Sequence, residues 1–200
     1  MMNSNSQSRT VLAILLSVSL LATGCSAQWI GVALADLPVL VQMALNIGTL
    51  VTTLQLGQQL SATEAAAIQN ISTEASKDLN LLQALYNDYK ANPSATAIQK
   101  IQNTIADINQ NLPAVLQAAH ISNPILSARV AAAVNLILTT VASFAALIPQ
   151  TGAPHMAQKR PARTIAVPHA ADLKKQWNQQ VCVPTGNRGF DSAFTGCMVR

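Results

Sequence analysis

The stretch SATEAAAIQNISTEASKDLNLLQALYNDY, residues 61–89, decides the fold class. Its apolar residues recur at intervals of three and four, which places them on one face of an α-helix. Ser61 and Glu64 form the pattern of a capping box at its start, and Asn92-Pro93 ends it. The stretch therefore predicts an amphipathic helix whose apolar face needs covering. That face consists of Ile68, Ile71, Ala75, Leu79, Leu82, Tyr86 and Tyr89.

A helix with the same kind of periodicity is predicted on the C-terminal side of this stretch. It begins near Ser94, and Pro113 should kink or restart it, with Asn111 as a candidate cap for the continuation. Its apolar residues alternate in steps of three and four, the spacing of a coiled-coil seam, so self-association is one use for them. They are Ile98, Ile101, Ile105, Ile108, Leu112 and Val115.

Two more helices are predicted, and both are almost free of charge. One runs from Asp36, a candidate N-cap, to Leu56, and the other from Ser122-Asn123-Pro124 to Ile148. Residues 37–56 and 130–148 contain no charged side chain and are long enough to cross a bilayer. Each nevertheless has polar residues along one side, which favours core helices over membrane-spanning ones. These are Gln42, Asn46, Thr49 and Thr53 in the first helix, and Asn135, Thr139, Thr140 and Ser143 in the second.

The connections between the predicted helices are only a few residues long, so neighbouring helices should pack antiparallel. No stretch alternates as a strand would. The sequence therefore predicts an all-α protein, an up-and-down bundle of about four helices over residues 36–149. Residues 150–200 form a basic, proline-containing tail, irregular apart from a short helix at about Ala170–Val181.

The amino-terminal segment has the features of a bacterial export signal. Arg9 precedes an apolar run, Val11–Ala22, that is too short to span a bilayer but suits a signal peptide. The run leads into Leu21-Ala22-Thr23-Gly24-Cys25, which resembles the lipobox of bacterial lipoproteins, although the usual leucine is displaced by one position. The resemblance implies that residues 1–24 are removed, that Cys25 receives the lipid, palmitate included, and that 25–35 is a linker. Ser26 after the cysteine favours the outer over the inner membrane by the family's sorting pattern.

The other two cysteines, Cys182 and Cys197, form an isolated pair in an exported chain. Such a pair is usually a disulfide, and closing this loop should contribute about 3 kcal/mol in the chain-entropy model. No CxxC motif accompanies them. A structural bridge is therefore predicted rather than a metal or redox site.

Charge is distributed unevenly along the chain. Residues 26–149 carry four basic and six acidic side chains, a net of −2, whereas 150–200 carry seven basic and two acidic, a net of +5. Such asymmetry suggests an anionic partner for the tail. Because an exported protein rarely meets nucleic acid, anionic lipid or a cell-wall polymer is the expected partner. The candidate contacts are Lys159, Arg160, Arg163, Lys174 and Lys175.

Nothing in the sequence predicts catalysis, a metal or a cofactor. His120, His155 and His169 lack ligand spacing, and there is no GxSxG, P-loop or GxGxxG motif. The sequence thus predicts a non-enzymatic, lipid-anchored helical protein on the periplasmic face of the bacterial envelope, acting as a structural or interaction module. Two alternatives remain: a membrane-embedded small pore or assembly factor with 37–56 and 130–148 inserted, and a carrier holding an apolar ligand between alanine-rich helices.

Overall fold

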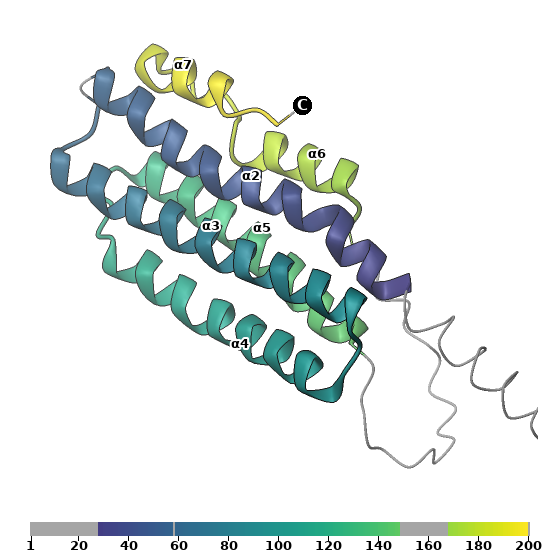
Figure 1. Ribbon diagram of the computed structural model, residues 1–200. Helices are drawn as coiled ribbons and strands as arrows, with labels where there is room; N and C mark the ends of the chain where they lie inside the picture. The colour runs from purple at the N-terminus through teal and green to yellow at the C-terminus, as the bar shows by residue number, and fades with distance from the viewer. Residues whose placement is uncertain (1–27, 58, 149–167, 200) are drawn as a thin grey trace, which may run out of the picture.

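The computed structural model describes residues 28–57, 59–148 and 168–199 (Figure 1). Within these ranges the protein is all-helical and contains no strand, as predicted. The helices are α2 (Gln28–Leu56), α3 (Ala62–Ala91), α4 (Ala95–Ala118), α5 (Pro124–Leu147), α6 (Ala170–Gln180) and α7 (Arg188–Gly196).

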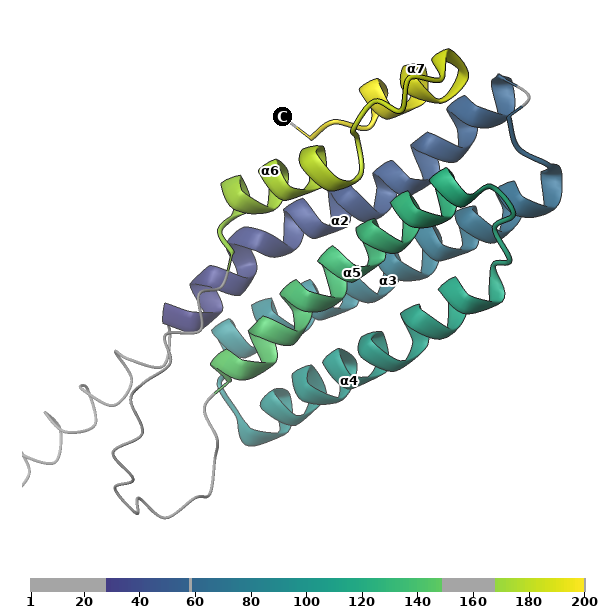
Figure 2. The same cartoon turned by 180° about the vertical axis from the view of Figure 1, so that it is seen from behind.

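The first four of these helices form an up-and-down bundle. Each packs against the next in the chain, and α5 returns to contact α2. The two remaining helices lie along α2 on the side away from α3, as the opposite views in Figures 1 and 2 show. As a result α2 is the central helix and contacts α3, α5, α6 and α7.

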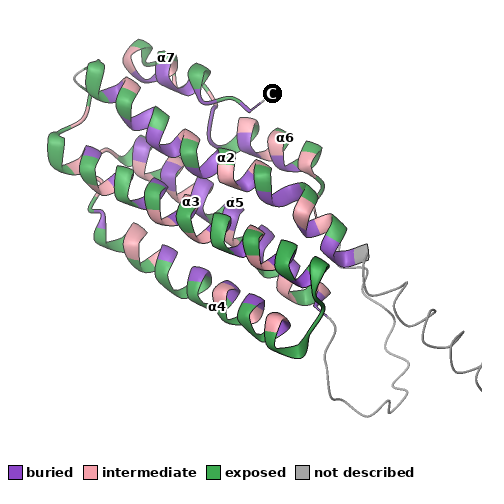
Figure 3. Cartoon of the chain, in the orientation of Figure 1, coloured by how far each residue is buried: buried purple, intermediate pink, exposed green. Residues whose placement is uncertain are grey.

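The predicted apolar stripes form the core of the bundle. All seven stripe residues of α3 are buried, and so are Ile98, Ile101, Ile105, Ile108 and Leu112 of α4. Figure 3 shows the exposed residues of both helices on their outward sides. Each buried leucine or isoleucine contributes about 1.5–3 kcal/mol relative to exposure. The seam of α4 is thus used inside the bundle, which removes the argument for self-association through it.

Helix caps fix where the elements meet. The Ser61 hydroxyl accepts a hydrogen bond from the Glu64 backbone N–H at 3.2 Å, and the Glu64 carboxylate accepts one from the Ser61 N–H at 3.3 Å, which confirms the capping box. The same carboxylate accepts a bond from the Ser122 N–H at 2.9 Å and so ties the start of α3 to the α4–α5 connection. Asn123 caps α5, with Pro124 in its first turn, as predicted.

One predicted helix start is wrong, and of the two effects predicted for Pro113, a kink or a restart, the restart does not occur. Asp36 does not cap a helix, because α2 is already helical at Gln28 and contains both Asp36 and Pro38 in its interior. Likewise, Pro113 does not restart α4, which continues through it to Ala118. In both cases a proline removes one backbone donor, but packing of the flanking turns against the bundle outweighs that loss.

Helices α2 and α3 approach closely at Gly48. The Ser72 hydroxyl donates a buried hydrogen bond to the Ala44 carbonyl at 2.7 Å, and a Cβ at Gly48 would lie 2.9 Å from that hydroxyl oxygen. Gly48→Ala should therefore lower the free energy of unfolding by about 1–3 kcal/mol through overpacking, measured by urea denaturation. Gly31→Ala is the matched control, because a Cβ there meets nothing within 4 Å and should stabilise the helix by up to about 1 kcal/mol. Equal effects of the two substitutions would contradict this account.

Candidate functional site

The two chain segments for which the sequence predicts membrane contact adjoin the same end of the bundle. Here α2 and α4 begin, α3 and α5 end, and α6 begins (Figures 1 and 2); we call it the anchor end. Cys25 lies outside the described residues, but three residues of chain reach at most about 11 Å, so a group on Cys25 stays close to this end. Segment 149–167, which carries Lys159, Arg160 and Arg163, also lies outside the described residues; it connects the end of α5 with the start of α6, and both of these lie at the anchor end.

A cluster of aromatic side chains closes the anchor end. The Trp29 ring lies 5.6 Å from the Tyr86 ring and 5.6 Å from the Tyr89 ring, and Tyr86 lies 6.4 Å from Phe144. The cluster joins α2, α3 and α5. Because Trp29 follows Cys25 by four residues, the start of α2 is fixed firmly to the bundle just after the predicted lipid site.

This cluster contains two buried polar atoms that have no hydrogen-bond partner, Trp29 Nε1 and Tyr86 Oη. Burial raises the pKa of the Tyr86 hydroxyl well above its ordinary value, so it stays neutral. Both rings therefore serve as apolar packing groups here.

The described part of the tail, residues 168–199, folds over α2 and α5, and we call it the C-terminal cover. Within it α6 matches the predicted short helix, whereas α7 was not predicted. The Cys182–Cys197 disulfide is formed, with Cα atoms 5.9 Å apart. The cover packs on the bundle through apolar side chains that are almost wholly buried: Leu173, Trp177, Val181, Phe190, Ala193, Phe194 and Val199.

Hydrogen bonds within the cover also join its own segments. The Trp177 Nε1–H donates to the Cys197 carbonyl at 2.9 Å, and Asn178 exchanges two hydrogen bonds with the backbone of Val199, at 3.0 and 3.1 Å. The Asp191 carboxylate accepts hydrogen bonds from Thr185 and from the N–H of Gly186, which adopts a positive φ of 82°. These bonds lower the pKa of the Asp191 carboxyl.

Polar contacts from α2 and α5 hold the cover at three places along its length. The Asp36 carboxyl lies near the backbone N–H of Ala170, the first residue of α6, which acts to lower the pKa of this carboxyl. Arg129 donates to the Gln180 carbonyl at 2.6 Å and to the Val183 carbonyl at 3.4 Å, and its guanidinium lies 5.8 Å from the centre of the Phe194 ring. The Asn46 amide donates to the Cys197 carbonyl at 3.1 Å.

Of these polar groups, Asp36 is the one whose burial is least balanced by hydrogen bonds. It is 1% exposed, and its Oδ2 atom has no hydrogen-bond partner. Burial raises the pKa of the Asp36 carboxyl, while the Ala170 N–H and the nearby His169 act in the opposite direction. The sequence contained a sign that Asp36 and Arg129 have a special role, because each is a single charge within a long apolar helix.

The remaining predicted residues do not converge on one site. Lys174 and Lys175 are partly buried and exposed, respectively, on α6. His120 and His169 are exposed on different segments, and His155 lies outside the described residues. In the part of the chain that the structure describes, no group of three or more His, Cys, Asp or Glu side chains could hold a metal ion.

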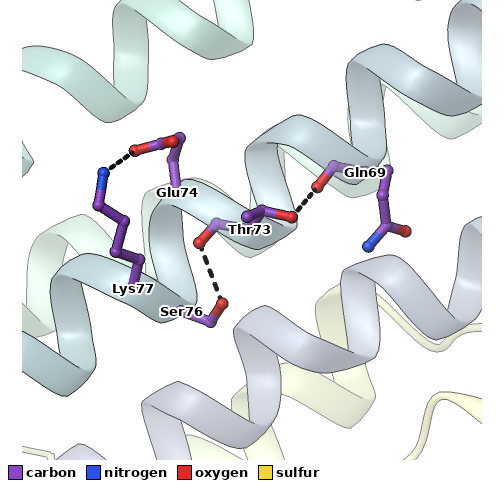
Figure 4. Close-up of polar contacts among 5 residues, drawn as sticks. All are labelled: Gln69, Thr73, Glu74, Ser76 and Lys77. Carbon is purple, nitrogen blue, oxygen red and sulfur yellow. Dashed lines mark hydrogen bonds and ion pairs between the residues drawn. The ribbon is translucent and has the colours of Figure 1, made fainter.

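Polar side chains on the outer side of α3 form short-range contacts. Lys77 pairs with Glu74 at 3.2 Å, Thr73 donates to the Gln69 carbonyl and Ser76 to the Thr73 carbonyl, as Figure 4 shows. Asp78, one turn after Glu74, is partly buried, and burial raises the pKa of its carboxyl. These contacts are typical of a helix surface and carry no catalytic arrangement.

Two described helices, Trp29–Leu56 and Pro124–Leu147, are long and apolar enough to cross a membrane by length and composition. In the bundle one side of each helix is buried against its neighbours.

No protein-family model, no curated protein and no solved structure matches this chain.

Proposed function

We propose that this protein is a non-enzymatic, lipid-anchored helical module of the bacterial cell envelope. The observation that carries the proposal is the position of the anchor end, where the lipobox-like Cys25 precedes a firmly packed α2 by three residues. A diacylated cysteine supplies the two chains that stable membrane attachment requires. The rigid bundle then stands directly on the membrane, at the periplasmic face and preferentially at the outer membrane.

The basic segment supports the same orientation. Lys159, Arg160 and Arg163 lie in a stretch whose two ends, Ile148 and Pro168, are at the anchor end. Near an anionic surface each such charge is worth about 1 kcal/mol. We therefore propose anionic lipid headgroups as the partner of these residues, with Lys175 on α6 as a further contact.

The decisive test is metabolic labelling with an alkyne analogue of palmitate. The wild-type chain should be labelled and found in the membrane fraction, whereas Cys25→Ala should lose all the label, because the acyl acceptor is gone. A chain carrying Cys182→Ala and Cys197→Ala is the matched control and should keep the label. Label on the Cys25→Ala protein, or its absence from the wild type, would overturn the proposal.

A further inference from the structure

The two most apolar helices each contain a single charged residue, Asp36 in α2 and Arg129 in α5. Both of these residues bind the cover. Asp36 lies near the backbone N–H of the first residue of α6, and Arg129 donates a hydrogen bond to the carbonyl of its last residue. The charges that would prevent α2 and α5 from entering an apolar phase are thus engaged at the two ends of α6.

Most hydroxyl groups of α2 and α5 do not depend on water. Six of their seven hydroxyls, all except Ser127, donate to a backbone carbonyl of their own helix, three or four residues earlier, at 2.6–3.4 Å. These six hydroxyls therefore need no water as a partner and are compatible with lipid, whereas the amides of the α2 stripe, Gln42 and Asn46, bond to each other and to the cover. The six hydroxyl residues are Thr49, Thr52, Thr53, Thr139, Thr140 and Ser143.

The cover has bonds of its own that join its two helices. Its disulfide, the Trp177–Cys197 hydrogen bond and the Asn178–Val199 pair all join α6 to the end of α7 without using the bundle. Among the described residues, Asp36 and Asn46 of α2 and Arg129 of α5 make polar contacts with the cover.

We propose that the C-terminal cover opens as a unit and that the faces of α2 and α5 beneath it bind a lipid bilayer. In the closed state these faces are occupied by the apolar side of the cover. In the open state they exchange that contact for acyl chains, and Asp36 and Arg129 are released to the membrane–water interface. Anchoring at the adjacent end of the bundle keeps the bilayer within reach.

The two charged residues act in opposite directions near neutral pH. Arg129 stabilises the closed state through two charge-assisted hydrogen bonds. Asp36 has a raised pKa in the closed state, so the stability it provides is present below its ordinary pKa and is lost as the pH rises through the raised value. His169, on the segment that leads into α6, is the titratable group whose charge acts on it. Acidification should therefore close the cover.

Two substitutions with matched controls test the proposal. Arg129→Gln removes the charge-assisted bonds, and Lys77→Gln removes one positive charge from the exposed pair on α3. Similarly, Asp36→Asn keeps an acceptor for the Ala170 N–H while removing the buried charge, and Glu74→Gln removes an exposed one. Circular dichroism confirms that each variant retains its helices.

The first measurement is hydrogen exchange on the full-length protein, expressed as protection factors so that the intrinsic pH dependence of exchange is removed. We expect Arg129→Gln to raise the opening constant of residues 170–199 about tenfold or more while α3 and α4 are unchanged. Asp36→Asn should lower the opening constant at neutral pH and remove the part of its pH dependence that comes from the raised pKa of Asp36. The two controls should behave as the wild type. If the cover and α3 open together in every variant, the cover is no separate unit and the proposal fails.

The second measurement uses vesicles of phosphatidylethanolamine and phosphatidylglycerol with a photoreactive acyl chain. Labelling of α2 and α5 peptides should increase several-fold in Arg129→Gln and decrease in Asp36→Asn. Opening without labelling of these helices would overturn the lipid-binding part. The inference rests on the proposed function only for the nearness of a bilayer, which added vesicles supply. If the palmitate labelling failed, the lipid anchor would be excluded, but hydrogen exchange and photolabelling with added vesicles would still test this inference.

Discussion

Trp177→Ala should cost the protein about 3–5 kcal/mol of stability in the C-terminal cover, the range for truncating a large buried aromatic residue. Trp177 is wholly buried, and its Nε1–H bond to the Cys197 carbonyl joins α6 to the end of α7. The substitution therefore removes packing against the bundle together with an internal brace. We expect hydrogen exchange in residues 170–199 to approach that of an unfolded chain before α3 and α4 lose protection.

The matched control for this prediction lies on the same helix. Lys175 is exposed, and Lys175→Ala should change stability by no more than about 0.5 kcal/mol. Trp177→Phe should fall between the two, since it keeps most of the apolar contact and loses the hydrogen bond. If Trp177→Ala destabilised α3 and α4 as much as the cover, the cover and the bundle would form one cooperative unit.

The bundle could be predicted from the sequence because its helices are amphipathic in a regular way. The stripes of α3 and α4 repeat every three to four residues and are buried as expected. The capping box at Ser61 and the Asn123-Pro124 start were equally local signals. Each of these features depends on residues within one or two turns, so a single sequence contains the whole pattern.

The cover could not be predicted in the same way, because its contacts join residues far apart in the chain. Asp36 was read as an N-cap from its neighbour Pro38, whereas it is a buried group that binds the start of α6. Helix α7 was missed because turn residues surround it, and its Phe190 and Phe194 gain their partners only when the cover folds onto α2. The disulfide pairing was predicted because no other cysteine remained.

The polar stripes of α2 and α5 were interpreted from the sequence as features of core helices, and the structure adds partners that periodicity does not predict. Periodicity alone places Thr49 and Thr53 on one side of a helix and suggests that the side faces water. The structure shows that their hydroxyls bond within the helix and that Asn46 bonds to the cover. The residue types therefore predicted which side of the helix is polar, but only the three-dimensional contacts showed what that side binds.

Removing the disulfide should have the second large effect. In Cys182→Ala/Cys197→Ala we expect a loss of about 3 kcal/mol, because the open chain of the cover regains the freedom that the bridge removes. Both sulfur positions are buried, at 0% and 1% exposure, so alanine introduces no unsatisfied polar group. Urea denaturation followed by hydrogen exchange in residues 182–199 measures the effect.

The position of the bridge also predicts the form of this loss. Because Cys182 and Cys197 both belong to the cover, the bridge stabilises the cover's own fold and does not attach it to α2. Without it, opening and unfolding of the cover should become the same event, and residues 182–199 should exchange as soon as the Arg129 contact breaks. Met198→Ala, beside the bridge at an exposed position, is the control and should leave stability within about 0.5 kcal/mol. A double-alanine variant whose cover stayed as protected as the wild type would show that docking on α2 alone maintains the fold of this segment, and the cover would then have no structure of its own to keep when it leaves.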